Sequence, residues 1–352
     1  MQESKERFIT EVFTVSSTAY FDEKSHLKPS DTEIPNLREL LKSLNKSMEK
    51  KLTTEYVNEA KGVLSLIQSV QLGTDENKTK ARVLEDLQSS LKKELKTLDD
   101  RLNSLCCNLE ECLSRGVEKS EKLCVKTTHD MLASVRPKTN KGFHKIYRAI
   151  CEREGCYWPR KWNEPIDLNK FLTKHMYDNI NQEFDLMFPV DDNDKTEKSV
   201  QAQVDKFNVS QRVLVSSIEI FIKTQETKLR ASLARDIIKK KKKIYSSIKT
   251  TIQQKMAPGY KRAAEERGDG CMERMEGIIT ETIEQLKYHM FSEAKSEALK
   301  MFNDLKLYII KTLESELMKS VERFLSQTSN ISLMDVSREI EELERLSQQL
   351  SD

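Results

Sequence analysis

Leucines recur at intervals of three or four residues along a long stretch of the chain. This spacing places them on one narrow side of a helix, close to the seam of a coiled coil. The pattern predicts a helix from about Lys78 to just before Pro137, which at 1.5 Å per residue is roughly 80 Å long. Its apolar side would serve as the core of a helical bundle or as a self-association face. The stripe consists of Leu84, Leu87, Leu91, Leu95, Leu98, Leu102, Leu105 and Leu109.

Three further amphipathic patterns predict long helices. The first begins near Thr32 and ends near Gly73, with Ile34, Leu37, Leu41 and Leu44 on one side. The second runs from about Ser199 to Met256, where Pro258 and Gly259 are expected to break it. The third runs from about Tyr260 to Phe324, with an interruption at residues 268–270. A short last helix is expected from Ser332 to Leu350.

These patterns predict an all-α fold, an elongated antiparallel bundle or stalk, because long helices joined by short turns bury their apolar sides by running back along one another. The composition agrees: 33% of residues are charged, and there are only 9 Gly and 7 Pro in 352 residues. The expected divisions are a first helical hairpin at 32–136, an aromatic-rich centre or hinge at 137–189, a linker at 190–198, a long hairpin at 199–330 and the C-terminal helix at 331–352.

The N-terminal segment FITEVFTVSS is the one pattern that favours a β-strand, because it alternates and is rich in β-branched residues. One strand cannot form a sheet. We therefore interpret residues 1–31 as the end of a domain whose other strands lie elsewhere, a short β-like segment followed by a polar loop.

Charge and cysteine content limit the classes of partner and compartment. The formal net charge is only +2, so any anionic partner would have to meet a local patch. The seven cysteines show no paired spacing, which favours reduced thiols. The first residues do not resemble a signal peptide, and no apolar run is long enough to cross a membrane. We expect an intracellular protein, nuclear or cytoplasmic.

The lysine run on the second long helix is the most prominent charged feature. Five consecutive lysines cover more than one helical turn, so some of them must face a packed side. A solvated helix face is the simplest explanation. An anionic lipid or a nucleic acid is the alternative partner, and a nuclear-import signal is a further one. The candidate patch comprises Arg235, Lys239, Lys240, Lys241, Lys242 and Lys243.

The centre of the chain holds both tryptophans and several other aromatic residues. We interpret it as a hinge or the core of a bundle tip, with a docking surface for a protein partner as the alternative, since Trp, Tyr and Arg are common interface anchors. Its candidate residues are Phe143, Tyr147, Tyr157, Trp158 and Trp162.

Residues that could perform catalysis are not arranged for it. The chain contains no GxxxxGK[ST] loop, so nothing in it is expected to cradle a nucleoside triphosphate. The five histidines are scattered, and His129 does not share a helix face with Cys124. We predict no catalytic residue, no cofactor and no metal site within this chain.

Several segments resemble a known family. VFTVSS followed by TEIPNLRELLKSLN is similar to the last strand and final helix of a GTPase domain of the dynamin superfamily. YVNEAKGVLSLIQSVQL, GFHKIYRAICEREGCYWPR, IDLNKFLTKHMYDNINQEFDLMFP and MAPGYKRAAEERGDGCMERM are similar to the C-terminal half of the nuclear GTPase SLIP-GC family.

The resemblance implies a GTP-hydrolysing domain upstream, a helical bundle beside it and a long stalk, with GTP and magnesium bound only in a full-length relative. It also implies that Ser16 and Ser17 line the edge of a guanine pocket. Two functional hypotheses follow. The chain is either the stalk that couples a GTPase domain to conformational change or self-assembly, or a free-standing scaffold that binds protein partners.

Overall fold

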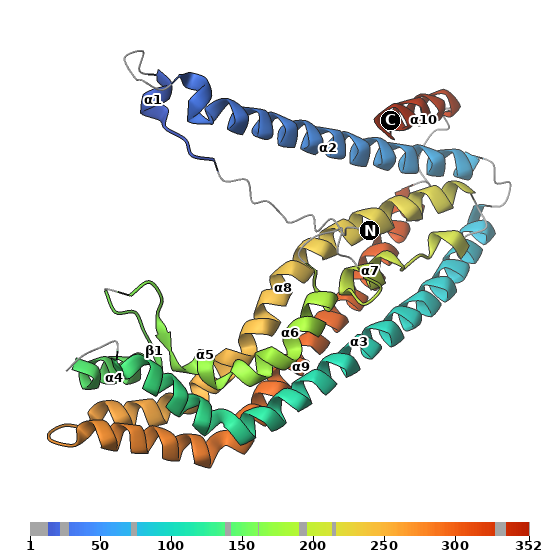
Figure 1. Cartoon of the computed structure of the whole chain (residues 1–352). Coiled ribbons are helices and arrows are strands. Elements are labelled where there is room, and N and C mark those ends of the chain that lie inside the picture. The colour runs from blue at the N-terminus through green and yellow to red at the C-terminus, as the bar shows by residue number, and fades with distance from the viewer. Residues whose placement is uncertain are drawn as a thin grey trace, which may run out of the picture. The chain divides into compact units, whose positions relative to one another are not determined.

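The computed structural model is almost entirely helical (Figure 1). It describes residues 13–21, 28–71, 76–137, 142–160, 162–189, 196–212, 216–327 and 336–351. The chain divides into two compact units, one made of residues 1–72 with 332–352 and the other of residues 73–331. Each unit is described by itself below.

Residues 13–17, the described part of the segment predicted as a strand, do not form one. Residues 13–16 belong to no strand, and a short helix, α1 (Ser17–Phe21), follows them. The amide of Tyr20 donates to the carbonyl of Ser16 (3.0 Å), which closes a helical turn. A strand needs a neighbouring ladder to satisfy its backbone groups, and this segment has none among the described residues. Residues 8–12 of the predicted strand lie outside the described residues.

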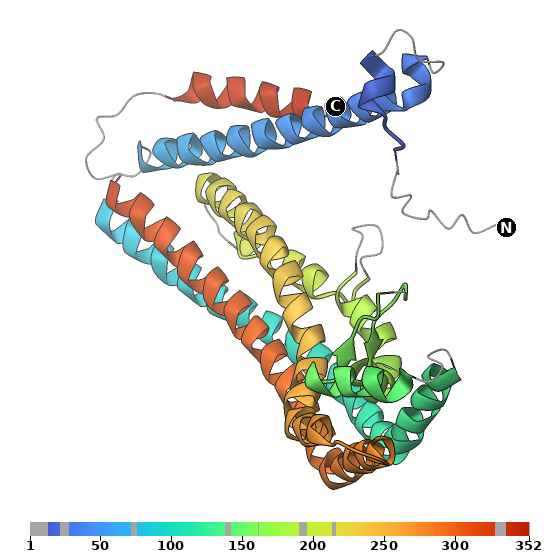
Figure 2. The same ribbon diagram turned by 90° about the vertical axis from the view of Figure 1, so that its left-hand side faces the viewer.

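Two helices dominate the first unit. After a 3₁₀ turn, η1 (Pro29–Thr32), helix α2 runs over Ile34–Gln71 as predicted, and α10 (Ser337–Ser351) lies alongside it (Figure 2). Val57 is buried, and Lys61 forms an ion pair with Glu344 of α10 (2.9 Å).

The apolar side predicted for α2 is not its buried side. Leu41 and Leu44 are exposed, whereas Val57 is buried. The structure also differs from the expectation of one hairpin over residues 32–136. Helix α2 packs with α10 in the first unit, and the next helix belongs to the second.

Three long helices form the second unit: α3 (Glu76–Val135), α8 (Ser216–Glu265) and α9 (Cys271–Gln327). Helix α9 packs against both α3 and α8, and α3 also contacts α6 (Lys174–Met187). The predicted leucine stripe is confirmed as core, because the leucines from Leu87 to Leu109 are buried along it. At 60 residues, α3 is roughly 90 Å long.

Helix α8 does not break where its proline predicted. It continues through Pro258 to Glu265, and the chain turns back into α9 at residues 266–270. Close packing explains this continuation: a Cβ at Gly259 would lie 2.5 Å from Cγ2 of Thr282 on α9, and Tyr260 is fully buried. This tertiary contact outweighs the local cost of a proline in a helix.

The predicted helix from Ser199 begins in separate pieces. Ser199 caps α7 (Val200–Asp205) by accepting a hydrogen bond from the amide of Ala202 (3.0 Å). A 3₁₀ turn, η4 (Ser210–Arg212), precedes α8. The predicted linker at 190–198 lies largely outside the described residues.

The aromatic-rich centre contains a small hairpin that the sequence did not predict. Helix α4 (Phe143–Glu152) leads into strand β1 (Cys156–Tyr157), which pairs antiparallel with β2 (Ile166–Asp167). Helix α5 (Leu168–Leu172) follows directly and continues into α6. The hairpin brings the end of α4 close to the start of α5.

Candidate functional site

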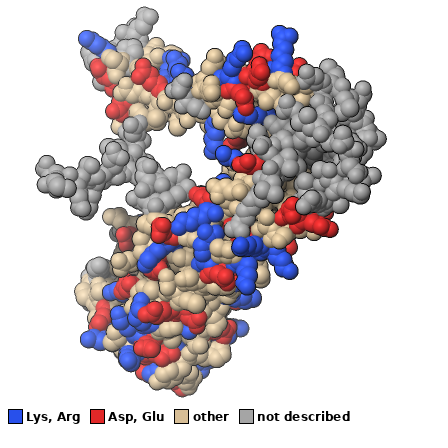
Figure 3. All heavy atoms as spheres, turned by 90° about the vertical axis from the view of Figure 1, so that its right-hand side faces the viewer, with Lys and Arg blue, Asp and Glu red and all other residues tan. Residues whose placement is uncertain are grey.

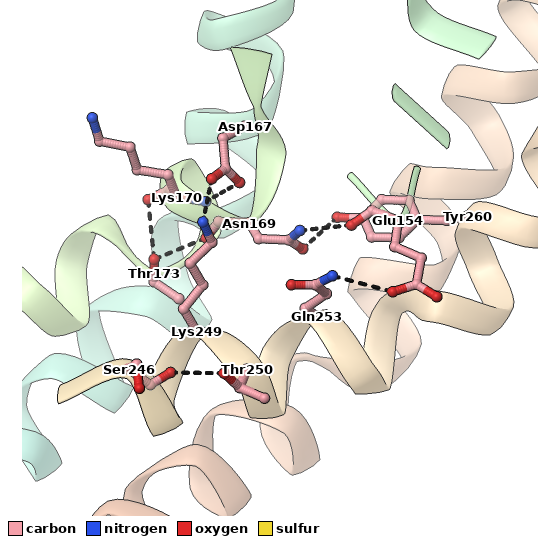
Figure 4. A network of polar contacts seen from close by, with 10 residues as sticks. All are labelled: Glu154, Asp167, Asn169, Lys170, Thr173, Ser246, Lys249, Thr250, Gln253 and Tyr260. Atoms are coloured by element: carbon pink, nitrogen blue, oxygen red, sulfur yellow. Dashed lines mark hydrogen bonds and ion pairs between the residues drawn. The ribbon is translucent and has the colours of Figure 1, made fainter. Parts of the chain in front are cut away.

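The two ends of the small hairpin and a helix about 80 residues further along the chain meet at one cluster of polar side chains within the second unit (Figure 4). We call this cluster the polar junction. It joins the turn after α4, the start of α5 and the C-terminal half of α8. Its members are Glu154, Asp167, Asn169, Lys249, Gln253 and Tyr260.

Asn169 is the centre of the polar junction and is fully buried. Its amide nitrogen donates to the carbonyl of Glu154 (2.7 Å), and its Oδ1 accepts from the hydroxyl of Tyr260 (2.8 Å). Its carbonyl accepts from the hydroxyl of Thr173 (2.8 Å). One side chain thereby ties the turn after α4 to α8, and an unpaired buried amide would be costly.

Asp167 adds a charged link between the hairpin and α8. Its Oδ1 caps α5 by accepting from the amide of Lys170 (3.0 Å), as an N-cap aspartate commonly does. Its Oδ2 pairs with the ammonium group of Lys249 on α8. On the same helix, Gln253 donates to the carboxylate of Glu154 (3.1 Å).

Gly155 allows these elements to approach. Its φ of +92° is a conformation that residues with a side chain rarely adopt. A Cβ at this position would lie 2.6 Å from Nδ2 of Asn169 and 2.7 Å from the hydroxyl of Tyr260. The amide of Leu168 also donates to the Gly155 carbonyl (2.8 Å). The position therefore needs glycine for both conformation and space.

Two weakly acidic groups at or near the polar junction, the Tyr260 hydroxyl and the Cys151 thiol, are held in their neutral forms. Burial raises the pKa of the Tyr260 hydroxyl well above its usual value, and the same cause raises the pKa of the Cys151 thiol to about 12. A phenol that stays protonated donates a hydrogen bond, and a protonated buried thiol is a poor nucleophile. The arrangement is suited to fixing the hairpin on α8 rather than to catalysis.

The predicted aromatic centre separates into two parts. Phe143 and Tyr147 are buried, with ring centroids 5.9 Å apart, and they form part of the core. Trp158 is 61% exposed, and its indole nitrogen donates to the carbonyl of Trp162 (2.8 Å) within the same loop. The guanidinium of Arg153 lies 4.9 Å from the centre of the Tyr157 ring.

Three of the six residues in the predicted basic patch have partners inside the chain. Lys239 pairs with Asp236 (3.2 Å), and Lys240 lies 4.5 Å from the centre of the Tyr308 ring. Lys241 donates to the carbonyl of Phe188. Arg235, Lys242 and Lys243 are exposed. On the face in Figure 3, acidic side chains lie among the basic ones.

A second buried carboxylate lies near the start of α8. Glu226 is fully buried and accepts from the amides of Val209 (2.5 Å) and Ser210 (3.3 Å). It also pairs with Arg230 (3.1 Å), which in turn donates to the carbonyl of Phe207 (2.5 Å). Burial raises the pKa of Glu226 despite these partners. This carboxylate holds the segment after α7 against α8.

The expectation that two serines line the edge of a guanine pocket stays a prediction. Ser16 and Ser17 are both exposed at the start of α1. Within the described ranges, no three side chains of His, Cys, Asp or Glu are grouped as metal ligands. The described helices also contain no apolar stretch that could cross a bilayer.

Sequence reasoning missed Asn169, Tyr260 and Glu226 as individual residues. The first two lie in the segments IDLN and MAPGY, on which the family resemblance rested. Glu226 carries no signal, because a glutamate within a charged helix gives no indication of burial.

Comparison with known proteins relates the chain to one kind of protein. It is 27% identical over 357 residues to "Nuclear GTPase SLIP-GC" of Mus musculus and 27% identical over 361 residues to the Homo sapiens protein of the same name. Each match covers 96% of this chain, and the chain spans 44% of the length of each relative. No family model matches the chain. No solved structure matches it either. The resemblance to the SLIP-GC family is confirmed.

Proposed function

We propose, from this relationship to nuclear GTPase SLIP-GC, that the chain is a helical stalk or effector region. In this role it couples a GTPase domain to conformational change or self-assembly and performs no catalysis itself. GTP and magnesium bind to the GTPase domain, upstream of this chain. A nuclear location follows from the relatives' name.

The observation that supports this most directly is the combination of similarity and a missing motif. Nearly the whole chain resembles proteins named as GTPases, yet it contains no GxxxxGK[ST] loop and spans less than half of their length. The nucleotide-binding part of such a protein therefore belongs to the remaining length, and the matching helical part has another task.

The packing of the second unit supports this task. Helices α8 and α9 pack along each other, and α9 also packs along α3, an arrangement that supports a role in carrying movement along the unit. The polar junction fixes the hairpin and α5 to α8, while Arg274 braces the α8–α9 turn through the carbonyls of Arg267 (2.6 Å) and Asp269 (2.8 Å).

A chimaera tests the proposal. This chain would replace the matching 44% of the mouse relative, and nucleotide-dependent assembly would be followed by light scattering beside phosphate release. We expect GTP to change the assembly state of the chimaera, with the unaltered mouse protein measured beside it as the reference. A matched chimaera with Tyr260→Ala should still release phosphate while its assembly response is weakened.

Two outcomes would contradict the proposal. In the first, the mouse protein responds to GTP in the same way when the matching region is deleted. In the second, a folded chimaera hydrolyses GTP and never changes its shape or assembly state.

The exposed indole of Trp158 favours a second candidate, a scaffold that binds protein partners. Because its nitrogen is already bonded within the loop, the ring offers a wholly apolar surface. In this case the full chain forms a chemical cross-link with a protein partner in the absence of nucleotide. Trp158→Ala should abolish that cross-link. Tyr288→Ala, which removes another exposed aromatic ring on α9, should leave that cross-link intact.

A further inference from the structure

The fold divides the lysine run of α8 into side chains that serve packing and side chains that remain free. Lys240 contacts the ring of Tyr308 on α9, and Lys241 donates to the carbonyl of Phe188 at the end of α6. Three other exposed cations of the same stretch have side chains that no ion pair or hydrogen bond engages within the described part of the chain. These three, which we call the basic face, are Arg235, Lys242 and Lys243.

The helix places the basic face in one direction. Lys242 lies seven residues after Arg235, which is almost two complete turns, and Lys243 follows it. The three side chains therefore leave α8 within about 100° of one another and along about 12 Å of its length. Because Lys240 and Lys241 bind neighbouring elements, their contacts hold the basic face toward solvent.

Nearby carboxylates reduce the positive charge of this stretch but do not cancel it. Asp236 is engaged by Lys239 (3.2 Å). The neighbouring helices α6 and α9 carry the exposed carboxylates Asp185 and Asp304, and neither forms an ion pair with the basic face. Residues 235–243 contain six cations, so three positive charges remain after all three carboxylates are counted. An anionic partner therefore meets a net attraction.

A lipid bilayer is a poor fit for this surface. A helix that lies in a membrane inserts its apolar side between the lipids. The apolar side of α8 is already buried in the core of the unit, as Ile237, Ile244 and Ile248 show. Within residues 235–248, Ile238 alone is a large exposed apolar side chain. The basic face thus offers charge without an apolar surface to insert.

Unpaired bases are an equally poor fit. Proteins that bind single strands present exposed aromatic rings on which the bases stack. The rings beside the basic face are engaged within the chain. Tyr308 carries the ammonium group of Lys240, and Tyr245 stacks on Tyr177 with ring centroids 4.6 Å apart. The surface is instead suited to the phosphate backbone of a duplex, which cations bind whatever the base sequence.

We propose that the basic face of α8 binds the phosphate backbone of double-stranded nucleic acid, through charge and without sequence preference. Each cation that neutralises a phosphate releases a condensed counterion, which favours binding at low salt. This role lies beyond the proposed coupling function, and its setting is the nuclear location proposed above. It needs no GTPase domain, so DNA binding can fail while the chimaera responds to GTP, and the reverse.

Fluorescence anisotropy of a short labelled DNA duplex, titrated with the full chain at several salt concentrations, tests the proposal. We expect a slope of log K against log salt of about −3, because each of three phosphate contacts contributes about 0.9. Glutamine at all three positions should lower the affinity at low salt by about tenfold or more and flatten this slope. The triple variant is Arg235→Gln, Lys242→Gln and Lys243→Gln.

Two control variants separate this surface from net charge. The first removes three exposed lysines of α3 that are equally close in sequence but have the exposed Asp100 on the next turn. It loses the same charge and should bind the duplex as the wild type does. Lys242→Arg with Lys243→Arg keeps the charge and should also bind normally, and circular dichroism would show that all variants keep their helices. The α3 replacements are Lys92→Gln, Lys93→Gln and Lys96→Gln.

The proposal is overturned if the wild-type chain does not bind the duplex at low salt, or if the triple variant of the basic face binds it equally well. An equal loss of affinity in the α3 variant would also overturn it, because net charge alone would then explain binding. Vesicles of phosphatidylserine and phosphatidylcholine complete the test. Tighter binding to these vesicles than to DNA, lost in the triple variant, would assign the basic face to a bilayer instead.

Discussion

The hydroxyl of Tyr260 on α8 donates a 2.8 Å hydrogen bond to Oδ1 of Asn169 at the start of α5, and both residues are fully buried. Tyr260→Phe would leave that oxygen without its donor in a site closed to water. We expect the free energy of unfolding to fall by about 1–3 kcal/mol, measured by urea denaturation. Tyr288→Phe removes a hydroxyl from an exposed tyrosine and should change stability by less than about 0.5 kcal/mol.

Gly155 and Gly268 form a matched pair, because both have a positive φ but only one is surrounded. Nothing lies within 4 Å of a Cβ at Gly268, whereas one at Gly155 would meet Asn169 and Tyr260. Gly268→Ala should therefore cost only the backbone strain, about 1–2 kcal/mol. Gly155→Ala should cost more, about 3 kcal/mol or above, because it also displaces the polar junction. If thermal unfolding showed equal losses of stability in the two variants, packing at Gly155 would be unimportant.

The buried Glu226 predicts a pH dependence of stability. Its pKa is higher in the folded chain than its ordinary value of 4.5, so the folded state binds more protons than the unfolded state once the pH exceeds that value. Its contribution to stability therefore decreases as the pH rises from below 4.5 through the raised pKa, and is constant above it.

Glu226→Gln removes this titration while its side-chain oxygen can still accept from Val209. The variant should gain stability relative to the wild type between pH 4 and pH 7, measured by urea denaturation at each pH. Glu314→Gln on α9 removes an exposed carboxylate and serves as the control. A difference between wild type and Glu226→Gln that does not change with pH would count against the raised pKa.

The lysine run predicts two separate effects. Lys242→Gln with Lys243→Gln alters exposed side chains and should change stability by less than about 0.5 kcal/mol. If the run meets an anionic lipid or nucleic acid, this double variant should weaken liposome or DNA binding at low salt. Unchanged binding would leave the lysines as a solvated face.

Lys240→Gln with Lys241→Gln should instead reduce stability, by about 1 kcal/mol. This pair loses the contact with the Tyr308 ring and the hydrogen bond to the Phe188 carbonyl. The two double variants remove the same charge, so a comparison of their thermal unfolding separates packing from net charge.

The periodic patterns were enough to predict the helical class and the long helices. The leucines from Leu87 to Leu109 recur at helical spacing, and burying them is favourable whatever their partner, so α3 could be predicted from its own sequence. The same holds for α9, whose residues from Ile279 to Val321 repeat every turn and are buried.

Tertiary packing decided what local sequence leaves open. Pro258 favours a break, yet contacts of Gly259 and Tyr260 with distant residues keep α8 continuous. The alternation at the N-terminus favours a strand, but a strand forms only where another supplies its hydrogen bonds. Periodicity identifies which residues share a side of a helix, and only the assembled chain determines whether that side is covered, as with the buried stripe of α3 and the exposed stripe of α2.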